Sequence, residues 1–187
     1  MILALLGKSG SGKDTTLNEL VKLGYKPIIP YTTRPIRPGE KEGETYFYVS
    51  KFKFFFMKLL GYFEHTSSYH VANGQVWHYG FSKNSLHTNN GVVILNPTVF
   101  KALNQKNNYS IFSALLDITP MTQQKRLLTR GDNQKEVERR IFADAEDFVG
   151  IRYNVDFVVP NDGVKNPSQI ASMIHKKYLE RKQRHAK

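Results

Sequence analysis

The segment Gly7-Lys8-Ser9-Gly10-Ser11-Gly12-Lys13 decides the fold expected for this chain of 187 residues. It matches the pattern G-x-x-x-x-G-K, and it lies between the apolar run Ile2–Leu6 and a stretch with helical spacing of leucine and valine. Such a turn lets backbone N–H groups converge on phosphate oxygens, and the following helix directs its positive end at the same charge. Lys13 then places an ammonium beside the β- and γ-phosphates of a nucleoside triphosphate. We therefore expect a nucleotide site formed by Gly7, Ser9, Gly10, Ser11, Gly12 and Lys13, with Lys13 as a catalytic residue.

The residue after Lys13 departs from the usual form of this motif. A serine or threonine that contacts Mg²⁺ is common there, whereas this chain has Asp14. A carboxylate can hold magnesium directly or through water, so we expect Asp14 to be the metal ligand. Two alternatives stay open: Thr15 supplies the hydroxyl, or Asp14 only stabilises the N-terminus of the helix. Asp14 and Thr15 are both counted with the nucleotide-binding residues.

Apolar runs alternate with helical patterns along most of the chain. After Ile2–Leu6 the runs are Val92–Leu95, Ile111–Leu116 and Val155–Val159. Helical spacing is expected over about 98–106, 120–130 and 134–151, and in a last helix that Pro167 begins. This alternation predicts an α/β fold, in which a parallel sheet carries helices on both faces.

Residues 31–91 interrupt this alternation. They are rich in Tyr, Phe, Gly and Thr, and pieces such as Thr45–Val49 show the alternation of a half-buried strand. We expect a small antiparallel insertion here, with one helix near 51–60.

Composition narrows the possible partners. The chain carries 27 Lys and Arg residues against 16 Asp and Glu residues, a formal net charge of +11. Such a balance predicts anionic partners, which include nucleotides, nucleic acids and acidic membrane surfaces. The absence of cysteine excludes a disulfide framework, a thiolate zinc site and a cysteine nucleophile. No stretch approaches the roughly 18 apolar residues of a membrane span, and we expect a cytoplasmic protein without a membrane partner.

A second group of residues suited to phosphate lies in the segment from Thr32 to Glu40. Arg34 and Arg37 are three positions apart, and prolines beside them restrict the backbone. Two guanidinium groups presented in this way can bind one phosphate with paired hydrogen bonds. An ordinary alternative is that they pair with nearby acidic residues such as Glu40.

The chain resembles the guanylate kinases. The pattern T-T-R-x-x-R-P-G-E-x-x-G-x-x-Y of that family runs intact from Thr32 to Tyr46. The resemblance also includes the phosphate loop and the segments Phe63-Glu64, Tyr79-Gly80, Arg126–Gly131 and Asn161-Asp162. It implies a single domain with a P-loop NTPase core (1–30, 92–124 and 141–187). A nucleoside-monophosphate-binding insertion (31–91) and a helical lid (125–140) would complete it.

The same resemblance implies roles for particular residues. The acceptor phosphate would be held by Arg34, Arg37, Tyr46 and Tyr79. Glu64 would accept the N1–H and amino hydrogens of guanine. Arg130 and Arg140 would contact the transferring phosphoryl group, with Arg139 as the competitor of Arg140. Asn161 would lie near the adenine of ATP.

Several positions depart from the family pattern near the expected base, metal and acceptor. They are Pro30, Phe81 and the stretch Leu95-Asn96-Pro97-Thr98, which replaces a segment with two aspartates. The segment His65–His78 is also longer than the corresponding loop of the family. These differences leave the base specificity and the choice between a ribose and a deoxyribose acceptor open.

The leading function is ATP-dependent phosphorylation of GMP or dGMP, with Mg²⁺ as the metal cofactor. One alternative keeps the reaction and changes the acceptor to another nucleoside monophosphate. A second is a non-catalytic binding module, although such modules lose the phosphate loop that is retained here. A third is nucleic-acid binding, which the charge would allow, but no base-stacking motif is visible and we expect no nucleic-acid partner.

Overall fold

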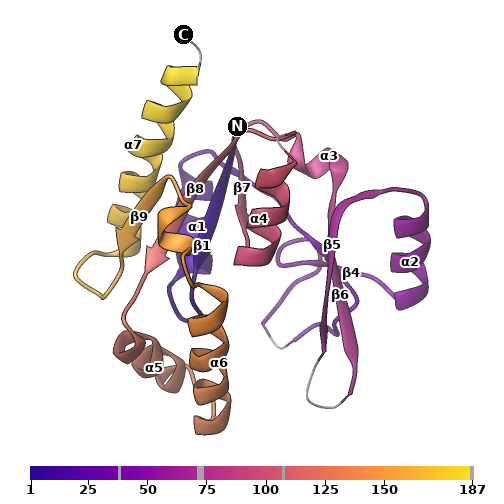
Figure 1. Cartoon of the computed structure of the whole chain (residues 1–187), viewed down its shortest axis with the longest axis horizontal. Coiled ribbons are helices and arrows are strands. Elements are labelled where there is room, and N and C mark those ends of the chain that lie inside the picture. Colours follow the sequence, from indigo (N-terminus) through magenta and orange to yellow (C-terminus); the bar gives the residue numbers. More distant parts are fainter. Residues whose placement is uncertain (38, 71–73, 107, 186–187) are drawn as a thin grey trace.

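The computed structural model describes residues 1–37, 39–70, 74–106 and 108–185. Pro38 of the arginine–proline segment and residues 71–73 of the long 65–78 segment lie outside this range. Figure 1 shows two sheets side by side, with the phosphate loop emerging from the first and the helix pair of the expected lid below it.

The first sheet has five parallel strands in the order β2-β7-β1-β8-β9. Their bounds are Lys26–Pro27 for β2, Gly91–Ile94 for β7, Ile2–Gly7 for β1, Ile111–Asp117 for β8 and Phe157–Pro160 for β9. Every residue of β1 is buried, as the continuous apolar run predicts for a central parallel strand. The phosphate loop therefore begins at the carboxyl edge of the middle strand, where open parallel sheets bind ligands.

Helices cover both faces of this sheet, as the alternation predicted. One hydrophobic cluster joins Leu3 and Leu5 to α1 (Lys13–Lys22) and α7 (Pro167–His185). The other joins Ile2, Ala4 and Leu6 to α4 (Pro97–Gln105) and the short helix η1 (Ile151–Tyr153). Because successive residues of a strand point to opposite faces, one run of five apolar residues supplies both clusters.

The second sheet is formed by the insertion and has the order β4-β3-β6-β5. The bounds are Phe47–Tyr48 for β4, Tyr31–Thr32 for β3, Val76–Ser82 for β6 and Phe63–His70 for β5. The pairs β3–β6 and β5–β6 are antiparallel, as expected, but β3 and β4 run parallel. The segment between these two strands therefore crosses over and is not a tight hairpin. Helices α2 (Lys51–Leu59) and α3 (Lys83–Leu86) complete this part.

The expected lid is a helix pair, α5 (Pro120–Thr129) and α6 (Gln134–Asp147). Side chains cap both N-termini: Thr119 accepts from the N–H of Thr122, and Asn133 from that of Glu136. The proposed limits of the lid, 125 and 140, fall inside these helices. Among the described residues, none of the helices combines the length and the apolar character that a membrane crossing requires.

Candidate functional site

The phosphate loop is shaped by glycines at its two ends. A side chain on Gly7 would place its Cβ 2.4 Å from Ser11 Oγ and 2.8 Å from the carbonyl oxygen of Leu116. Gly12 precedes α1 with a φ of 86°, a left-handed conformation that glycine adopts without strain. The close approach and the turn together explain why both positions carry glycine.

Lys13 lies at the floor of the loop. Its Nζ donates hydrogen bonds to the carbonyl oxygens of Gly7 at 2.8 Å and Lys8 at 3.0 Å. Burial lowers the pKa of this ammonium, while the nearby carboxylates of Asp14 and Asp144 oppose the shift. A desolvated cation at this point is suited to attract phosphate oxygens.

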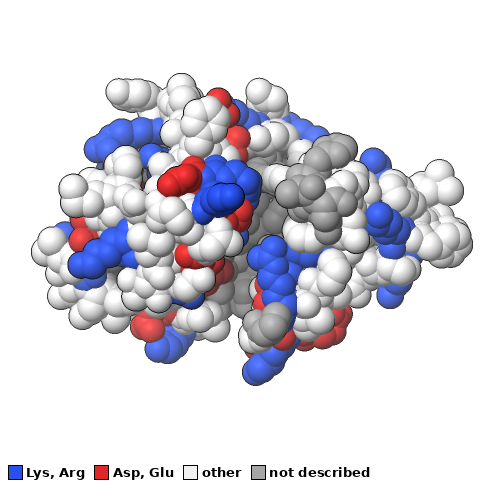
Figure 2. Space-filling model, turned by 90° about the horizontal axis from the view of Figure 1, so that it is seen from below, with Lys and Arg blue, Asp and Glu red and all other residues white. Residues whose placement is uncertain are grey.

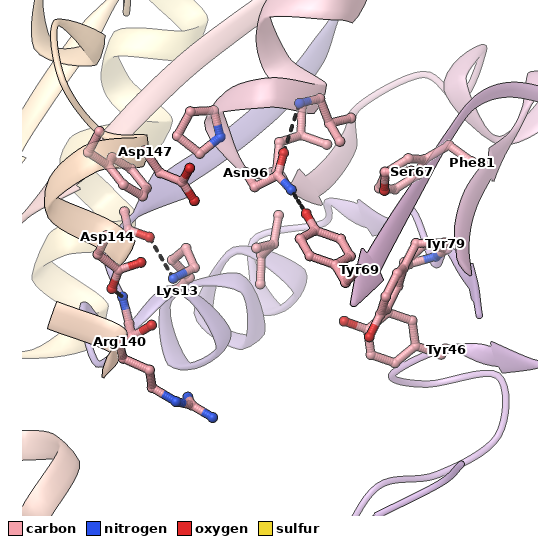
Figure 3. A pocket seen from close by; sticks show the side chains of 18 residues that line it. Lys13, Tyr46, Ser67, Tyr69, Tyr79, Phe81, Asn96, Arg140, Asp144 and Asp147 are labelled. Carbon is pink, nitrogen blue, oxygen red and sulfur yellow. Dashed lines mark hydrogen bonds between the residues drawn. The ribbon is translucent and has the colours of Figure 1, made fainter. Parts of the chain in front are cut away.

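A carboxylate of helix α6 accepts a hydrogen bond from one backbone N–H group of the phosphate loop. Asp144 on α6 accepts a hydrogen bond from the backbone N–H of Ser9 at 2.6 Å, and the same oxygen accepts one from Gln123 of α5 at 2.6 Å. Figure 3 shows Asp144 beside Lys13. Backbone N–H groups of such a loop are the donors that phosphate oxygens need. Asp144 therefore occupies a donor that a phosphate oxygen would use.

We expect Asp144→Asn to tighten ATP binding by about two- to fivefold, the effect of removing a screened charge repulsion of up to about 1 kcal/mol. Isothermal titration calorimetry with ATP measures the change, which should shrink as salt is raised. Asp147→Asn is the matched control. Asp147 lies on the same helix and, like Asp144, lines the cavity between the two sheets that is described below, but within the described residues it makes no hydrogen bond to the loop. Weaker ATP binding by Asp144→Asn, or an equal gain in the control, would contradict this role.

A cavity of about 400 Å³ lies on the helix side of the phosphate loop. Its described lining includes the predicted residues Gly10, Gly12, Lys13, Asp14, Thr15, Arg130 and Asn161. Asn161 is buried, and its Nδ2 donates to the carbonyl oxygen of Ser11 at 2.7 Å. Its amide therefore holds the loop directly, in addition to any contact with a nucleotide.

Arg126 is a residue of this cavity that the sequence analysis missed. Its guanidinium donates to the carbonyl oxygens of Gly10 at 3.2 Å and Asn161 at 2.7 Å, so it joins the lid helix to the phosphate loop. Its position could have indicated this role, because Arg126 lies four residues before Arg130 and residues at this spacing share one face of a helix. Asp144 carried the same signal relative to Arg140.

A second cavity, of about 450 Å³, lies between the two sheets. Figure 3 shows Lys13, Arg140, Asp144 and Asp147 on one side of it and Tyr46, Tyr79, Ser67 and Phe81 on the other. Gly7 and Ser9 of the phosphate loop also line the second cavity. Lys13 lines both the first and the second cavity. Lys13 therefore stands at the junction of the two cavities.

The long segment between Glu64 and Tyr79 supplies part of the wall of this second cavity. Tyr69 from β5 packs edge-on against Tyr79, with ring centroids 5.3 Å apart. Its hydroxyl group is hydrogen-bonded by the side-chain amide of Asn96, which also caps α4. The segment thus extends the β5–β6 hairpin and brings an aromatic side chain to the cavity, together with Ser67.

Tyr46 and Tyr79 line the second cavity, whereas Arg34 lies behind them. The guanidinium of Arg34 is 5.2 Å from the ring centre of Tyr46 and pairs with Glu40 at 2.6 Å. The side chain of Arg34 is only 4% exposed. Burial alone would lower the pKa of the Arg34 guanidinium. The hydrogen bond to Glu40 and the charge of that carboxylate outweigh this effect and raise the pKa above its usual value, so Arg34 keeps its positive charge. Burial, followed by the proximity of Tyr79, raises the pKa of Tyr46 to about 12, so its hydroxyl remains a hydrogen-bond donor.

Arg37 and Glu64 are also outside the described lining of the second cavity. The guanidinium of Arg37 lies 5.8 Å from the ring centre of Trp77. Glu64 sits at an irregularity in the pairing of β5 with β6, and it accepts a hydrogen bond from Lys106 at 2.8 Å. That bond, with a further one from Tyr109, holds the pKa of Glu64 below its usual value. The predicted guanine contact is thus engaged in an ion pair in this structure.

The two neighbouring arginines of α6 face different environments. Arg140 lines the second cavity, while Arg139 does not, although both pair with Glu136 at 2.7 Å. Arg130 pairs with Asp132 and lines the first cavity. This arrangement favours Arg140 over Arg139 as the arginine that reaches a phosphoryl group.

No group of three or more His, Asp or Glu side chains is gathered as a metal site within the described ranges. Asp14 and Thr15 are both exposed at the first cavity and offer oxygen atoms, the ligand type that magnesium prefers. These two residues therefore fit a magnesium ion and would supply part of its oxygen ligands.

Comparisons with known proteins give one family. Residues 1–177 match a family model described as guanylate kinase. A guanylate kinase of Wolinella succinogenes is 31% identical over 191 residues, which cover 97% of this chain and 86% of that protein. A guanylate kinase of Blochmanniella floridana is 30% identical over 170 residues, covering 82% of this chain and 75% of its own length.

The fold has a counterpart among solved structures. The crystal structure of guanylate kinase from Anaplasma phagocytophilum superposes with a TM-score of 0.69 and 21% sequence identity. The match covers 98% of this chain and 86% of that one. The likeness in fold therefore extends over both sheets and the α5–α6 helix pair.

Proposed function

This chain belongs to the guanylate kinase family, and we propose that it transfers the γ-phosphoryl group of ATP to GMP, giving ADP and GDP. The observation that carries the proposal is the position of Lys13, which lines both cavities at their junction. ATP occupies the cavity beside Asn161, and the monophosphate occupies the cavity beside Tyr46 and Tyr79. The phosphoryl group then crosses at Lys13.

The transfer needs no covalent intermediate on the protein. An oxygen of the acceptor phosphate forms a bond to the γ-phosphorus while the bond from that phosphorus to the β–γ bridging oxygen breaks and ADP leaves. Lys13, Arg130 and Arg140 stabilise the negative charge on the transferring group. The hydroxyls of Tyr46 and Tyr79 donate to the acceptor phosphate. Arg34 and Arg37 lie outside the described lining of this cavity and would reach the phosphate only after their side chains leave Glu40 and Trp77. Closure of the α5–α6 lid excludes water, which would otherwise hydrolyse ATP.

Asp14, with Thr15 beside it, is proposed to hold the magnesium ion together with phosphate oxygens of ATP. When bound, the ion neutralises negative charge on the phosphates. In its absence, Asp14 adds negative charge near the phosphates, so Asp14→Ala should change the dependence of ATP binding on magnesium. An unchanged magnesium dependence would leave Thr15 or other ligands as the alternative.

The base of the acceptor has two groups of possible contacts. Glu64 would accept hydrogen bonds from guanine after it exchanges Lys106 for the base, as the family resemblance implies. Alternatively, Ser67, Tyr69 and Asn96, which already line the cavity, read the base. The second possibility depends on the long β5–β6 segment, which carries Ser67 and Tyr69.

The function is tested by following ADP formation with GMP, dGMP, AMP, dTMP and dCMP as acceptors. We expect GMP and dGMP to give the largest kcat/KM, because only guanine offers the N1–H and amino donors together. If Glu64 reads the base, Glu64→Gln should raise KM for GMP by about tenfold or more, as expected when a charged hydrogen bond worth about 1.5–3 kcal/mol is weakened. KM for ATP should stay the same. Tyr69→Phe is the matched variant that tests the other contact group, formed by Ser67, Tyr69 and Asn96.

A preference for AMP, dTMP or dCMP would replace guanine by another base while keeping the reaction. The absence of ATP binding would instead favour a non-catalytic module. A cytoplasmic location and the absence of a nucleic-acid partner remain proposals, and a salt-dependent shift of DNA at physiological ionic strength would overturn the second.

A further inference from the structure

Helix α2 exposes an unusual number of large apolar side chains. Phe52 is 83% exposed, Leu59 82% and Leu60, just after the helix, 68%. Phe55 and Phe56 are about half exposed. With 3.6 residues per turn these five side chains fall on one broad face, opposite the buried Phe54. We call this face the α2 apolar face; it consists of Phe52, Phe55, Phe56, Leu59 and Leu60.

The helix is fixed to the molecule through its other side. Phe54 is 1% exposed and stacks on Phe63, with ring centroids 4.6 Å apart, and its ring also lies 5.7 Å from that of His78. The N-terminus is capped by the hydroxyl of Ser50, which accepts from the N–H of Lys53. Within the α2 apolar face, Phe55 also packs edge-on against His78, with ring centroids 4.9 Å apart, whereas Phe52, Leu59 and Leu60 are mostly exposed.

Lysines border the α2 apolar face on both sides. Lys51 and Lys58 lie along one edge and Lys53 along the other, as the helical repeat dictates. All three are exposed, and within the described residues none of them pairs with a carboxylate. The sequence from Thr45 to Phe63 contains no acidic residue. In Figure 2 the end of the molecule where α2 lies, at the extreme right, is white and blue without red.

The shape of this region selects among possible occupants. Figure 1 places α2 at the outer edge of the second sheet, away from the core sheet and the lid. It is a protruding helix and not a groove, so it suits a flat surface better than a peptide. A second copy of this chain would bring the same lysines together on a protein whose formal net charge is already +11. An anionic lipid surface satisfies both features, because it takes up aromatic and leucine side chains while its headgroups attract lysine.

We propose that this protein binds reversibly to the surface of membranes that contain anionic lipids, with the α2 apolar face in the interface and Lys51, Lys53 and Lys58 at the level of the headgroups. The proposal concerns attachment to one surface and not a membrane-spanning segment. It differs from the expectation, from sequence alone, that a membrane is not a partner.

The test is co-sedimentation of the full chain with vesicles. We expect binding to phosphatidylcholine vesicles that contain about 30% phosphatidylserine, and at least about tenfold weaker partitioning to phosphatidylcholine alone, because each lysine near an anionic surface adds to the attraction. The double variant Phe52→Ser/Leu59→Ser should lose at least about tenfold in partitioning, because two apolar side chains no longer enter the interface. A triple change of Lys51, Lys53 and Lys58 to Gln should abolish the preference for the anionic lipid.

Phe142→Ser is the matched control, because Phe142 is 67% exposed on α6, away from α2. It should sediment with the vesicles as the unchanged protein does. Thermal melting checks that each variant is folded. If the Phe52→Ser/Leu59→Ser variant fails to fold, the triple lysine variant still tests the proposal. Three results would overturn the proposal: the unchanged protein sediments no more than the double variant does, it binds both vesicle types equally, or it binds neither. A concentration-dependent dimer that the double variant abolishes, without vesicle binding, would assign the face to a second copy.

This inference stands apart from the proposed reaction. The five residues of the α2 apolar face are absent from the described lining of both cavities. The double variant should therefore keep the kcat and KM of the unchanged protein when vesicles are absent. Vesicle binding without kinase activity would refute only the reaction, and activity without vesicle binding would refute only the membrane surface.

Discussion

Lys13→Met is expected to lower kcat for phosphoryl transfer by about 10²–10³-fold, the cost typical of removing one preorganised group that stabilises transition-state charge. Lys13 lines both cavities, and its ammonium is buried against the carbonyl oxygens of its own loop. A methionine keeps the unbranched apolar stem, so the change mainly removes the charge. Steady-state assays of ADP formation give kcat and KM, and calorimetry gives the affinity for ATP.

Lys8→Met is the matched control for this substitution. Lys8 belongs to the same loop and contributes its backbone carbonyl to Lys13, while its side chain forms no hydrogen bond or ion pair within the described residues. Its kcat should change by less than about twofold, as is usual for a surface side chain outside the site. Equal losses in the two variants would mean that net charge near the loop matters and not the position of Lys13.

Arg140→Ala is expected to produce a loss of similar size, about 10²–10³-fold in kcat, because an arginine that contacts the transferring group acts mainly in the transition state. The side chain of Arg140 is 26% exposed and lines the second cavity, with Lys13 among the other residues of the lining. KM for GMP should change much less than kcat if the contact forms only as the phosphoryl group moves. The kcat and KM values of the variant, measured at saturating ATP, separate the two effects.

Arg139→Ala provides an unusually close control. Arg139 is the next residue of the same helix, pairs with the same carboxylate of Glu136 and is 64% exposed. Arg139→Ala removes two hydrogen bonds to Glu136 and Arg140→Ala removes one. Because ion pairs near the surface are worth about 1 kcal/mol or less, both Tm values should shift only slightly, and only Arg140→Ala should lose activity. If Arg139→Ala is the inactive variant, the lid closes in a different register and the assignment moves by one residue.

Much of the fold could be predicted from local patterns. The run Ile2–Leu6 and the glycine motif after it predicted a buried strand, a turn and a helix, and these are β1, the phosphate loop and α1. These elements could be predicted because backbone preference and the periodicity of buried residues depend only on residues that are close in sequence. The parallel pairing of β3 with β4 was not predictable in this way, because it depends on how a crossing segment of about fifteen residues is accommodated.

Partners of charged side chains were harder to predict than elements. Arg126 was not among the predicted site residues, yet it binds two carbonyl groups beside the phosphate loop. Glu64 was expected to face the base, but Lys106, 42 positions away, accompanies it. A long charged side chain reaches whichever opposite charge the fold brings near, and sequence spacing does not encode that choice.

The sequence by itself determined that a strand, a glycine-rich turn and Lys13 would form a phosphate site on a parallel sheet. It did so because each of those features depends on neighbouring residues. Only the tertiary structure decided that Asp144 takes the N–H of Ser9 and that Arg140, not Arg139, lines the cavity. It also left one face of α2 uncovered. Those outcomes depend on which distant segments pack together, and that is settled by the burial of the whole core and not by any short stretch of chain.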